Sequence, residues 1–282
     1  MRVAVLKGGR SLERAVSLRS GARVEDALEG LGHTVVPFDV GENLVSLLRG
    51  ARPDAAFVAM HGPGGEDGTV QELLDILGIP HTGPGVASCL RCTDKVLTKY
   101  RLREAGISTP DWVAFNSTAF RNLGAGDLLG EIEARLGFPL VVKPATGGSS
   151  LGVGFAAGPD DVAGAIVAAF SYDDRVLLER HVAGRELAVS LLGGGEVLPT
   201  VEVVPREADR FNYEARYEIG RTSYRCPAEL GNAEEESVRG AARGAWEALG
   251  CEGFARVDLL LRGGVAEVID VNAVPGLTDT SL

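Results

Sequence analysis

The chain has 282 residues, of which 45% are hydrophobic and 24% charged, and its formal net charge at pH 7 is −11. A chain of this length is too long for one ordinary hydrophobic core, so two domains or three small lobes are expected. No apolar run reaches the roughly 18 residues that a membrane span needs, and the net negative charge disfavours nucleic acid and anionic lipid as partners.

Three short apolar runs alternate with helical patterns near the N-terminus, at residues 3–6, 34–38 and 55–60. This order is typical of strands in an open parallel α/β sheet. The first run is too short for a signal peptide and leads into a glycine turn, so we expect a cytoplasmic protein. Polar, glycine-rich loops at residues 8–13 and 61–69 follow the first and third strands, where such sheets bind ligands.

Helical spacing dominates the connections between these strands. In the first helix the apolar residues recur at i, i+3, i+4 and i+7 and are expected to form one buried stripe: Val24, Ala27, Leu28 and Leu31. Gly32 is expected to end that helix. A single helix is predicted over residues 86–105, and Gly106 ends it. An extended connection follows, where we place the first lobe boundary.

The sequence contains four cysteines, Cys89, Cys92, Cys226 and Cys251. So few cysteines fit reduced intracellular thiols better than a disulfide framework. Cys89 and Cys92 form a C-x-x-C pair, which alone is a weak signal for zinc or redox chemistry. On a predicted helix, we interpret them as small packing residues.

The predicted elements divide the chain into three lobes: an α/β lobe over residues 1–106 and α+β lobes over residues 107–193 and 194–282. The central lobe combines predicted helices with short strands. In the third lobe a helix over residues 234–249 precedes two paired strands at residues 255–261 and 265–271.

A lysine at the end of a predicted strand precedes a glycine-rich loop, KPATGGSSLGVG at residues 143–154. Successive backbone N–H groups in such a loop can bind phosphate, and Lys143 adds a point charge. The spacing lacks G-K-[ST], so it is not a Walker A loop. Alone the loop is moderate evidence, because many glycine-serine loops are only hairpin turns.

Three oxygen-bearing side chains lie on the two paired strands of the third lobe. A hairpin would bring Asp258 together with Asp270 and Asn272, and the i, i+2 spacing puts the last two on one face. Mg²⁺ prefers such ligands. Asp-x-Asn alone more often marks a strand that ends in a turn, so the metal interpretation depends on the upstream glycine loop.

Together these residues resemble the ATP-grasp ligases and, within them, the D-alanine:D-alanine ligases. The similar segments, in order, are GGRSLERAVS at 8–17, HGPGGEDGTVQ at 61–71, TGPGV at 82–86, the loop at 143–152, FNYEARY at 211–217, ARVD at 255–258 and NAVPGLT at 272–278. Their order and spacing make the resemblance specific. It implies an ATP-grasp fold: an N-terminal open parallel α/β lobe and two α+β lobes that clamp a nucleotide.

The resemblance implies ADP-forming ligation of two D-alanines through a D-alanyl phosphate, for peptidoglycan precursor synthesis. The implied cofactors are ATP and two Mg²⁺ (or Mn²⁺) ions. The implied partners are two molecules of D-alanine and a second copy of the chain, joined through the N-terminal lobe as a homodimer. A carboxylate must be phosphorylated before an amine can displace it, so these cofactors suit the reaction.

The resemblance also assigns roles to individual residues. It implies ATP contacts from Lys95, Lys143, Ser149, Glu179, Val182, Glu186 and Arg216, and metal contacts from Asp258, Asp270 and Asn272. It implies D-alanine binding by Glu13, His61, Ser281 and Leu282, with Glu13, Ser149 and Tyr217 locking the loops shut. Arg256 and the Gly276 N–H are expected to stabilise the oxyanion, with Ser281 beside them. Plainer alternatives are a helix N-terminal charge for Glu13 and a loop support for His61.

The sequence departs from the family pattern at four places. Asp270 stands where glutamate is common, Arg216 where lysine is common, and Ala15 where an acidic residue is common. Family members also continue for roughly another helix after the Ser281-Leu282 pair. If the chain ends at Leu282, its terminal carboxylate is expected to oppose the second substrate's carboxylate by about 1 to 4 kcal/mol.

Three alternatives to this function remain. One is a ligase that makes D-alanyl-D-lactate or D-alanyl-D-serine, and Tyr217 favours the alanine enzyme by resemblance. Another is a different ATP-grasp carboxylate–amine ligase of a biosynthetic pathway. The third is a nucleotide-binding regulator without catalysis, which would not need substrate residues such as Glu13, Ser149 and Arg256.

Overall fold

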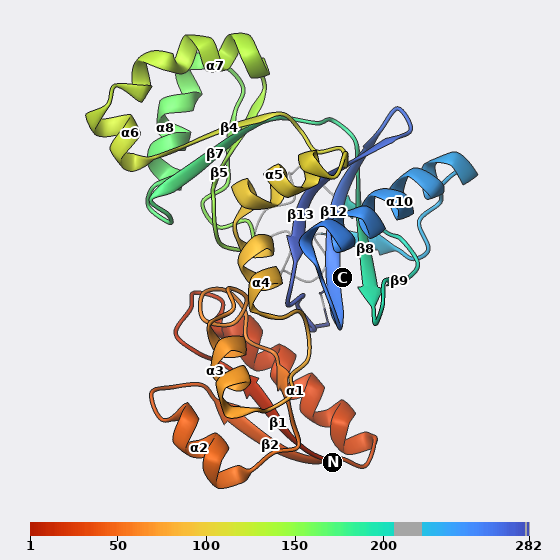
Figure 1. Ribbon diagram of the computed structural model, residues 1–282. Coiled ribbons are helices and arrows are strands. Elements are labelled where there is room, and N and C mark those ends of the chain that lie inside the picture. The colour runs from red at the N-terminus through yellow and green to blue at the C-terminus, as the bar shows by residue number, and fades with distance from the viewer. Residues whose placement is uncertain (206–221, 280, 282) are drawn as a thin grey trace.

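Three β-sheets organise the chain in the computed structural model, which describes residues 1–205, 222–279 and 281 (Figure 1). The N-terminal sheet is parallel, in the order β2-β1-β3, as predicted. Its strands are β1 (Arg2–Lys7), β2 (Thr34–Asp39) and β3 (Ala55–Val58), and its helices are α1 (Arg14–Gly30), α2 (Leu44–Ala51) and α3 (Thr69–Leu77). The loops at residues 8–13 and 61–69 therefore both follow the carboxyl ends of parallel strands.

The predicted apolar stripe of α1 is confirmed only in part. Val24 is buried and Leu28 is half-buried, but Ala27 is exposed and Leu31 is 74% exposed. The other buried residues of this helix lie outside the predicted stripe: Val16, Ser17, Ser20 and Gly21. At Gly21 a Cβ would come within 2.6 Å of the Lys7 side chain, so helix and strand approach too closely for larger residues. Apolar periodicity alone therefore selected only part of the buried face.

The single helix predicted over residues 86–105 is two helices, α4 (Val86–Thr93) and α5 (Lys95–Glu104). Asp94 between them has extended backbone angles, and its carboxylate accepts hydrogen bonds from the N–H groups of Val96 and Leu97, both at 3.0 Å. Aspartate is a weak residue inside a helix and a strong N-cap, which explains the break. The new helix begins at Lys95.

The central sheet is antiparallel, in the order β4-β7-β5-β6. Its strands are β4 (Trp112–Asn116), β5 (Leu140–Pro144), β6 (Gly154–Ala156) and β7 (Arg175–Arg180). The accompanying helices are α6 (Ser117–Asn122), the 3-10 turn η1 (Ala125–Leu128), α7 (Leu129–Leu136) and α8 (Pro159–Ala169). Buried side chains of α7, α8 and this sheet form one apolar core.

The third sheet is also antiparallel, in the order β11-β10-β8-β12-β13, with β9 on β8. It comprises β8 (Arg185–Leu192), β9 (Glu196–Val197), β10 (Val201–Pro205), β11 (Thr222–Arg225), β12 (Phe254–Arg262) and β13 (Val265–Asn272). Helix α10 (Asn232–Leu249), α4 and α5 pack against it. The predicted boundary between the second and third lobes, at residue 193, lies just after β8. Strand β8 pairs with β10 and β12 of the third sheet, so the chain passes from the central sheet to the third sheet earlier, between β7 and β8.

The cysteines are free thiols, in agreement with the sequence interpretation. Cys89, Cys92 and Cys251 are buried in the core between α4 and the third sheet, and the Cys92 and Cys251 sulfurs are 3.8 Å apart. Burial raises the pKa of the Cys89 thiol to about 12, so it stays protonated. Within the described residues, no group of three or more His, Cys, Asp or Glu side chains is placed to hold a metal ion, so the cysteines belong to no such group.

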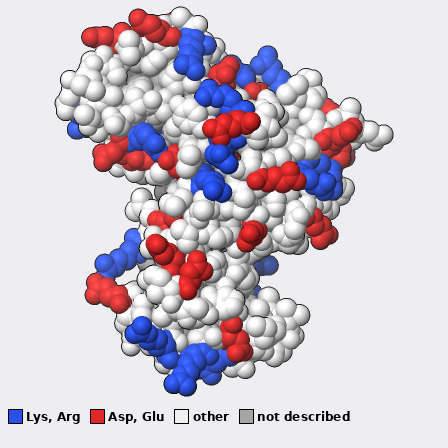
Figure 2. Space-filling model, in the orientation of Figure 1, with Lys and Arg blue, Asp and Glu red and all other residues white. Residues whose placement is uncertain are grey.

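Two properties of the whole molecule bear on its partners. None of the helices in the described part of the chain combines the length and apolar character that a bilayer crossing needs. On the face in Figure 2, acidic and basic side chains are interspersed. The negative net charge is thus not gathered into one patch on that face.

Candidate active site

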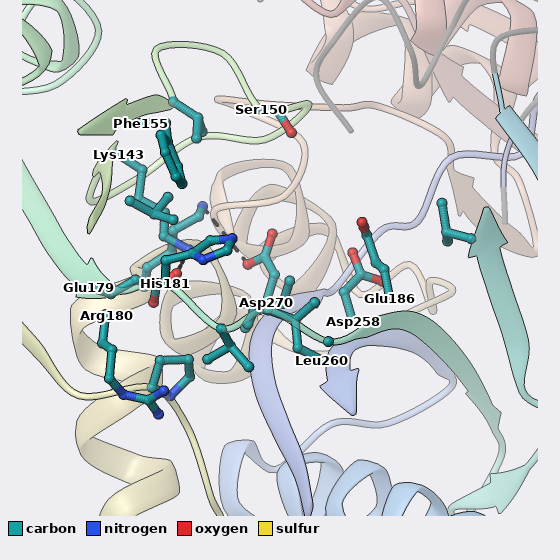
Figure 3. A pocket seen from close by; sticks show the side chains of 18 of the residues that line it. Lys143, Ser150, Phe155, Glu179, Arg180, His181, Glu186, Asp258, Leu260 and Asp270 are labelled. Carbon is teal, nitrogen blue, oxygen red and sulfur yellow. Dashed lines mark ion pairs between the residues drawn. The ribbon is translucent and has the colours of Figure 1, made fainter. Parts of the chain in front are cut away.

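A cavity of about 960 Å³ lies between the central and third sheets (Figure 3). Its walls come from β5, the glycine loop, β7, β8 and the β12–β13 pair. It brings together most of the residues predicted to bind nucleotide and metal: Lys95, Lys143, Glu179, Val182, Glu186, Asp258 and Asp270. These residues span 176 positions of sequence from Lys95 to Asp270, and the two sheets facing each other make them neighbours.

Lys143 and Glu179 form an ion pair on neighbouring strands of the central sheet, with Nζ 2.5 Å from Oε1. A second lysine, Lys99 of α5, reaches the other carboxylate oxygen at 2.8 Å. Burial alone would raise the pKa of Glu179, but the two ammonium groups outweigh it and lower the pKa to about 2. Glu179 is therefore an anion shared by two cations.

Lys99 was not among the predicted site residues. It is 2% exposed, and it also donates hydrogen bonds to the Thr109 hydroxyl at 2.7 Å and the Pro110 carbonyl at 2.9 Å. Burial lowers its pKa, and Glu179 acts in the opposite direction. The signal in the sequence was a lysine four residues after Lys95, on the same face of the helix.

Lys95, the first residue of α5, links the glycine loop to the acidic strand pair. Its ammonium group donates to the Gly147 carbonyl at 2.5 Å and lies 3.9 Å from Asp270 Oδ1. Its backbone N–H donates to the Ala145 carbonyl at 2.8 Å. The break at Asp94 therefore directs this cation toward the cavity.

The glycine loop connects β5 to β6, and hydrogen bonds to Asp173 hold its first residues in place. The backbone N–H and the hydroxyl of Thr146 both donate to one Asp173 oxygen, at 2.7 Å each. Further along, Ser149 and Ser150 have positive φ values of 52° and 57°, a conformation that costs non-glycine residues energy. External contacts must therefore hold the loop in this shape.

One of these contacts comes from the N-terminal lobe. The Ser149 hydroxyl donates a hydrogen bond to Glu13 Oε1, and both side chains are 5% exposed. Glu13 precedes α1, yet its side chain makes no capping hydrogen bond to that helix. Glu13 thus stands at the N-terminus of α1, as the plainer interpretation requires, while its carboxylate contacts the glycine loop.

The acidic strand pair lies across from this loop. Asp258 and Asp270 face each other across β12 and β13, and Arg256 faces Asn272. Arg256 binds Asp258 through two hydrogen bonds of 2.6 and 2.9 Å, and the Asn272 amide donates to Asp258 at 3.1 Å. Figure 3 shows the Asp258 and Asp270 carboxylates pointing into the cavity with that of Glu186. Like charges on opposite strands repel, so this arrangement favours a bound cation.

The remaining predicted substrate residues are His61, which follows β3, and the residues that follow β13. His61 is 3% exposed and contacts the Val274 carbonyl and the Ser20 hydroxyl. At Gly276 a Cβ would meet Ser281 Oγ at 2.7 Å, so a side chain there would displace that serine. Arg216, Tyr217 and Leu282 lie outside the described residues.

Comparison with known proteins identifies the family. A family model described as the D-ala D-ala ligase C-terminus matches residues 102–282. The chain belongs to the D-alanine–D-alanine ligase family. Relatives with that name include one from Desulforudis audaxviator, 43% identical over 286 residues that cover 100% of this chain and 90% of the relative. One from Alcanivorax borkumensis is 43% identical over 282 residues, covering 100% of this chain and 86% of the relative.

Solved structures of family members show the same fold. A D-alanine–D-alanine ligase from Bacillus anthracis superposes with a TM-score of 0.86 at 35% identity, over 100% of this chain and 90% of that chain. The same enzyme complexed with ATP gives 0.83 at 33%, over 100% and 89%. VanG D-Ala:D-Ser ligase from Enterococcus faecalis gives 0.82 at 29%, over 100% and 92%. The predicted ATP-grasp architecture is thereby confirmed.

Proposed function

We propose that the protein joins two D-alanines into D-alanyl-D-alanine, forming ADP and phosphate through a D-alanyl phosphate. The observation that carries the proposal is the convergence of Lys95, Lys143 and the Asp258–Asp270 pair on one cavity. A nucleotide-binding regulator would need only that cavity. The buried Glu13–Ser149 contact beside the glycine loop supports an enzyme, because it supplies an anion for a substrate ammonium group.

ATP fits this cavity by charge and by shape. Lys95 and Lys143 would contact its phosphates, with the backbone and hydroxyls of the glycine loop closing over them. Val182 and Glu186 would line the adenosine, and Arg216 would contact a phosphate. Glu179 is bound by Lys143 and Lys99, so its part is to hold the phosphate-binding lysine in place.

The acidic strand pair fits one or two Mg²⁺ or Mn²⁺ ions. Asp258, Asp270 and Asn272 offer hard oxygen ligands, and Asp270 reaches the cavity although it is shorter than the usual glutamate. When bound, the ions would neutralise charge on the transferring phosphoryl group. Arg256 binds the Asp258 carboxylate and Lys95 lies near that of Asp270, so both carboxylates are oriented by a neighbouring cation.

The two amino acids would bind on either side of the glycine loop. Glu13 would hold the ammonium group of the first D-alanine, and Ser149 with Tyr217 would close the loops over it. His61, Ser281 and Leu282 would surround the second D-alanine. Loop closure matters because water would otherwise hydrolyse the acyl phosphate.

The amine of the second D-alanine would attack the acyl phosphate carbonyl and create a tetrahedral intermediate whose former carbonyl oxygen is negatively charged; its collapse would expel phosphate. The Gly276 N–H and Arg256 would stabilise that oxyanion, by about 3 to 4 kcal/mol for a good donor. Arg256 is already aligned by two hydrogen bonds to Asp258, which reduces the reorganisation needed during reaction. We further propose a cytoplasmic homodimer formed through the N-terminal lobe.

A second candidate function follows from one comparison. The solved structure with 29% identity is a D-Ala:D-Ser ligase. The second substrate of this protein could therefore be D-serine, or D-lactate, in place of D-alanine. D-alanine and D-serine both attack through an amine, which must first lose a proton, and differ in their products, whereas D-lactate attacks through its hydroxyl and should differ in pH dependence. Assays with D-alanine, D-serine and D-lactate over a pH series would separate them.

The decisive experiment measures phosphate release from ATP and Mg²⁺ with D-alanine, L-alanine or no amino acid, and identifies products by mass spectrometry. We expect D-alanine alone to yield phosphate and dipeptide in equal amounts. ATP binding without any dipeptide would overturn the proposed ligation.

A further inference from the structure

Ser20 is a fully buried serine of α1 that contacts both His61 and the segment after β13. Its hydroxyl oxygen lies 2.8 Å from His61 Nε2, and it accepts a hydrogen bond from the Leu277 N–H at 3.1 Å. The residue lies 257 positions before Leu277 in sequence. Ser20 therefore joins the N-terminal lobe to a segment of the third lobe.

The other nitrogen of His61 returns to the same segment. Nδ1 lies 3.1 Å from the Val274 carbonyl oxygen and 3.4 Å from Glu66 Oε1, and both of these oxygens are acceptors. In the neutral ring, Nδ1 must then carry the hydrogen, and Nε2 must accept one. Ser20 can supply that hydrogen from its hydroxyl while its lone pair receives the Leu277 N–H.

With His61 in this tautomer, the hydrogen bonds form a path with one direction, from the Leu277 N–H through Ser20 and His61 to the Val274 carbonyl. Its two ends bracket Gly276. Every group in the path is satisfied, and Ser20, His61 and Val274 are all buried, so the path is well defined and disruption would be costly.

We propose that Ser20 is a positioning residue for the reaction, which acts through His61 to hold the Gly276 N–H where the oxyanion forms. This inference rests on the proposed function, because it assigns Gly276 to the second step. It gives His61 a supporting part in that step, since the protein already engages both ring nitrogens.

A role for Ser20 in holding Gly276 would affect one chemical step and not the other. Formation of the acyl phosphate uses the lysines and metal ligands of the cavity, which Ser20 does not contact. Attack by the second amine uses the Gly276 N–H. A displaced Gly276 would slow only the second step, and the waiting acyl phosphate would react with water instead.

The test compares Ser20→Ala with Ser17→Ala. Ser17 is also fully buried, lies one turn earlier on α1, and makes two backbone contacts, donating to the Ala59 carbonyl at 2.7 Å and accepting from the Gly8 N–H at 2.8 Å. The two variants thus remove similar contacts from the same helix, but only Ser20 reaches the segment that contains Gly276.

The readout is phosphate released per dipeptide formed, with the rate of D-alanyl phosphate formation followed by hydroxylamine trapping. We expect S20A to form dipeptide about tenfold more slowly, to keep its trapping rate, and to release about two or more phosphates per dipeptide. We expect S17A to keep a ratio near one. S20C, which keeps a small side chain at this position but weakens the hydrogen bonds, serves if S20A does not fold.

The outcomes separate the two proposals. A wild-type protein that forms no dipeptide would overturn the proposed function. A wild type with a ratio near one and an S20A or S20C variant with the same ratio would overturn the role of Ser20 alone. Equal uncoupling in S17A and S20A would also overturn it, because any loosening of α1 would then be sufficient.

Discussion

The Ser149 hydroxyl donates a hydrogen bond to the Glu13 carboxylate across 136 positions of sequence, and both side chains are buried. This contact joins the glycine loop of the central lobe to the first loop of the N-terminal lobe. Under the proposed function, loop closure over the nucleotide and recognition of the first amino acid would involve the same hydrogen bond.

Ser149→Ala should therefore raise KM for the first D-alanine by about tenfold, because loss of one hydrogen bond to a charged group is worth about 1.5 to 3 kcal/mol. Steady-state kinetics at saturating ATP would measure it. Ser150→Ala is the matched control. Ser150 has a similar positive φ but lines the nucleotide cavity, so its loss should leave KM for D-alanine unchanged at saturating ATP. An unchanged D-alanine KM in S149A would contradict the assignment of Glu13.

Lys99→Met should weaken both ATP binding and folding. It leaves Glu179 with Lys143 as its remaining lysine partner, so the Glu179–Lys143 pair loses the contact that fixes it to α5, and one charge of a buried network is lost. We expect KM for ATP to rise several-fold and the free energy of unfolding to fall by about 3 kcal/mol. In the K99M/E179Q double variant the excess buried negative charge is removed, so the free energy of unfolding should partly recover, whereas KM for ATP should stay raised because Lys143 has lost its carboxylate partner. An ATP KM equal to the wild-type value in the double variant would count against this arrangement.

The shared carboxylate should also make stability depend on acid pH. Its folded pKa of about 2 lies below the ordinary value of 4.5, so its contribution is present above pH 4.5 and is lost as pH falls toward 2. We expect about 2 kcal/mol of unfolding free energy to be lost between pH 5 and pH 3 from this group. Urea unfolding of Glu179→Gln should show a shallower decline. Glu104→Gln, in an exposed pair with Arg101, should follow the wild type.

Asp173→Ala should loosen the start of the glycine loop, because Asp173 accepts both the N–H and the hydroxyl of Thr146. We expect KM for ATP to rise by about fivefold while the melting temperature changes little, since the pair is exposed. Nucleotide binding by calorimetry would test this. The exposed neighbour Asp174 offers the control D174N, and equal effects of the two variants would refute the proposed anchor.

Asp270→Asn should raise the Mg²⁺ concentration needed for half-maximal activity by about tenfold or more, because a charged ligand becomes neutral. Activity titrated with MgCl₂ at fixed ATP would show it. Asp270→Glu, which restores the residue common at this position, should retain tight metal dependence. If D270N and the wild type require the same Mg²⁺ concentration, Asp270 is not a metal ligand.

The sequence by itself determined the features that arise from local pattern or from adjacent segments. The parallel N-terminal strands followed from alternating apolar runs, and the facing of Asp258 and Asp270 followed from a hairpin whose strands are neighbours in the chain. The lysine and glycine loop was recognisable because phosphate binding needs consecutive backbone donors. These features depend on residues close together in sequence.

Only the tertiary structure decided which distant residues meet. Helix α5 places Lys99 against Glu179 of β7, and helix α1 places Ser20 against Leu277 after β13; neither pair carries a local signal. Strand β8 is a further case. Its own sequence does not show whether it joins the central sheet or the third one, and its pairing with β10 and β12 decides that it belongs to the third. The buried face of α1 was predicted only in part for a related reason: close approach of helix and sheet favoured small residues over the larger apolar ones.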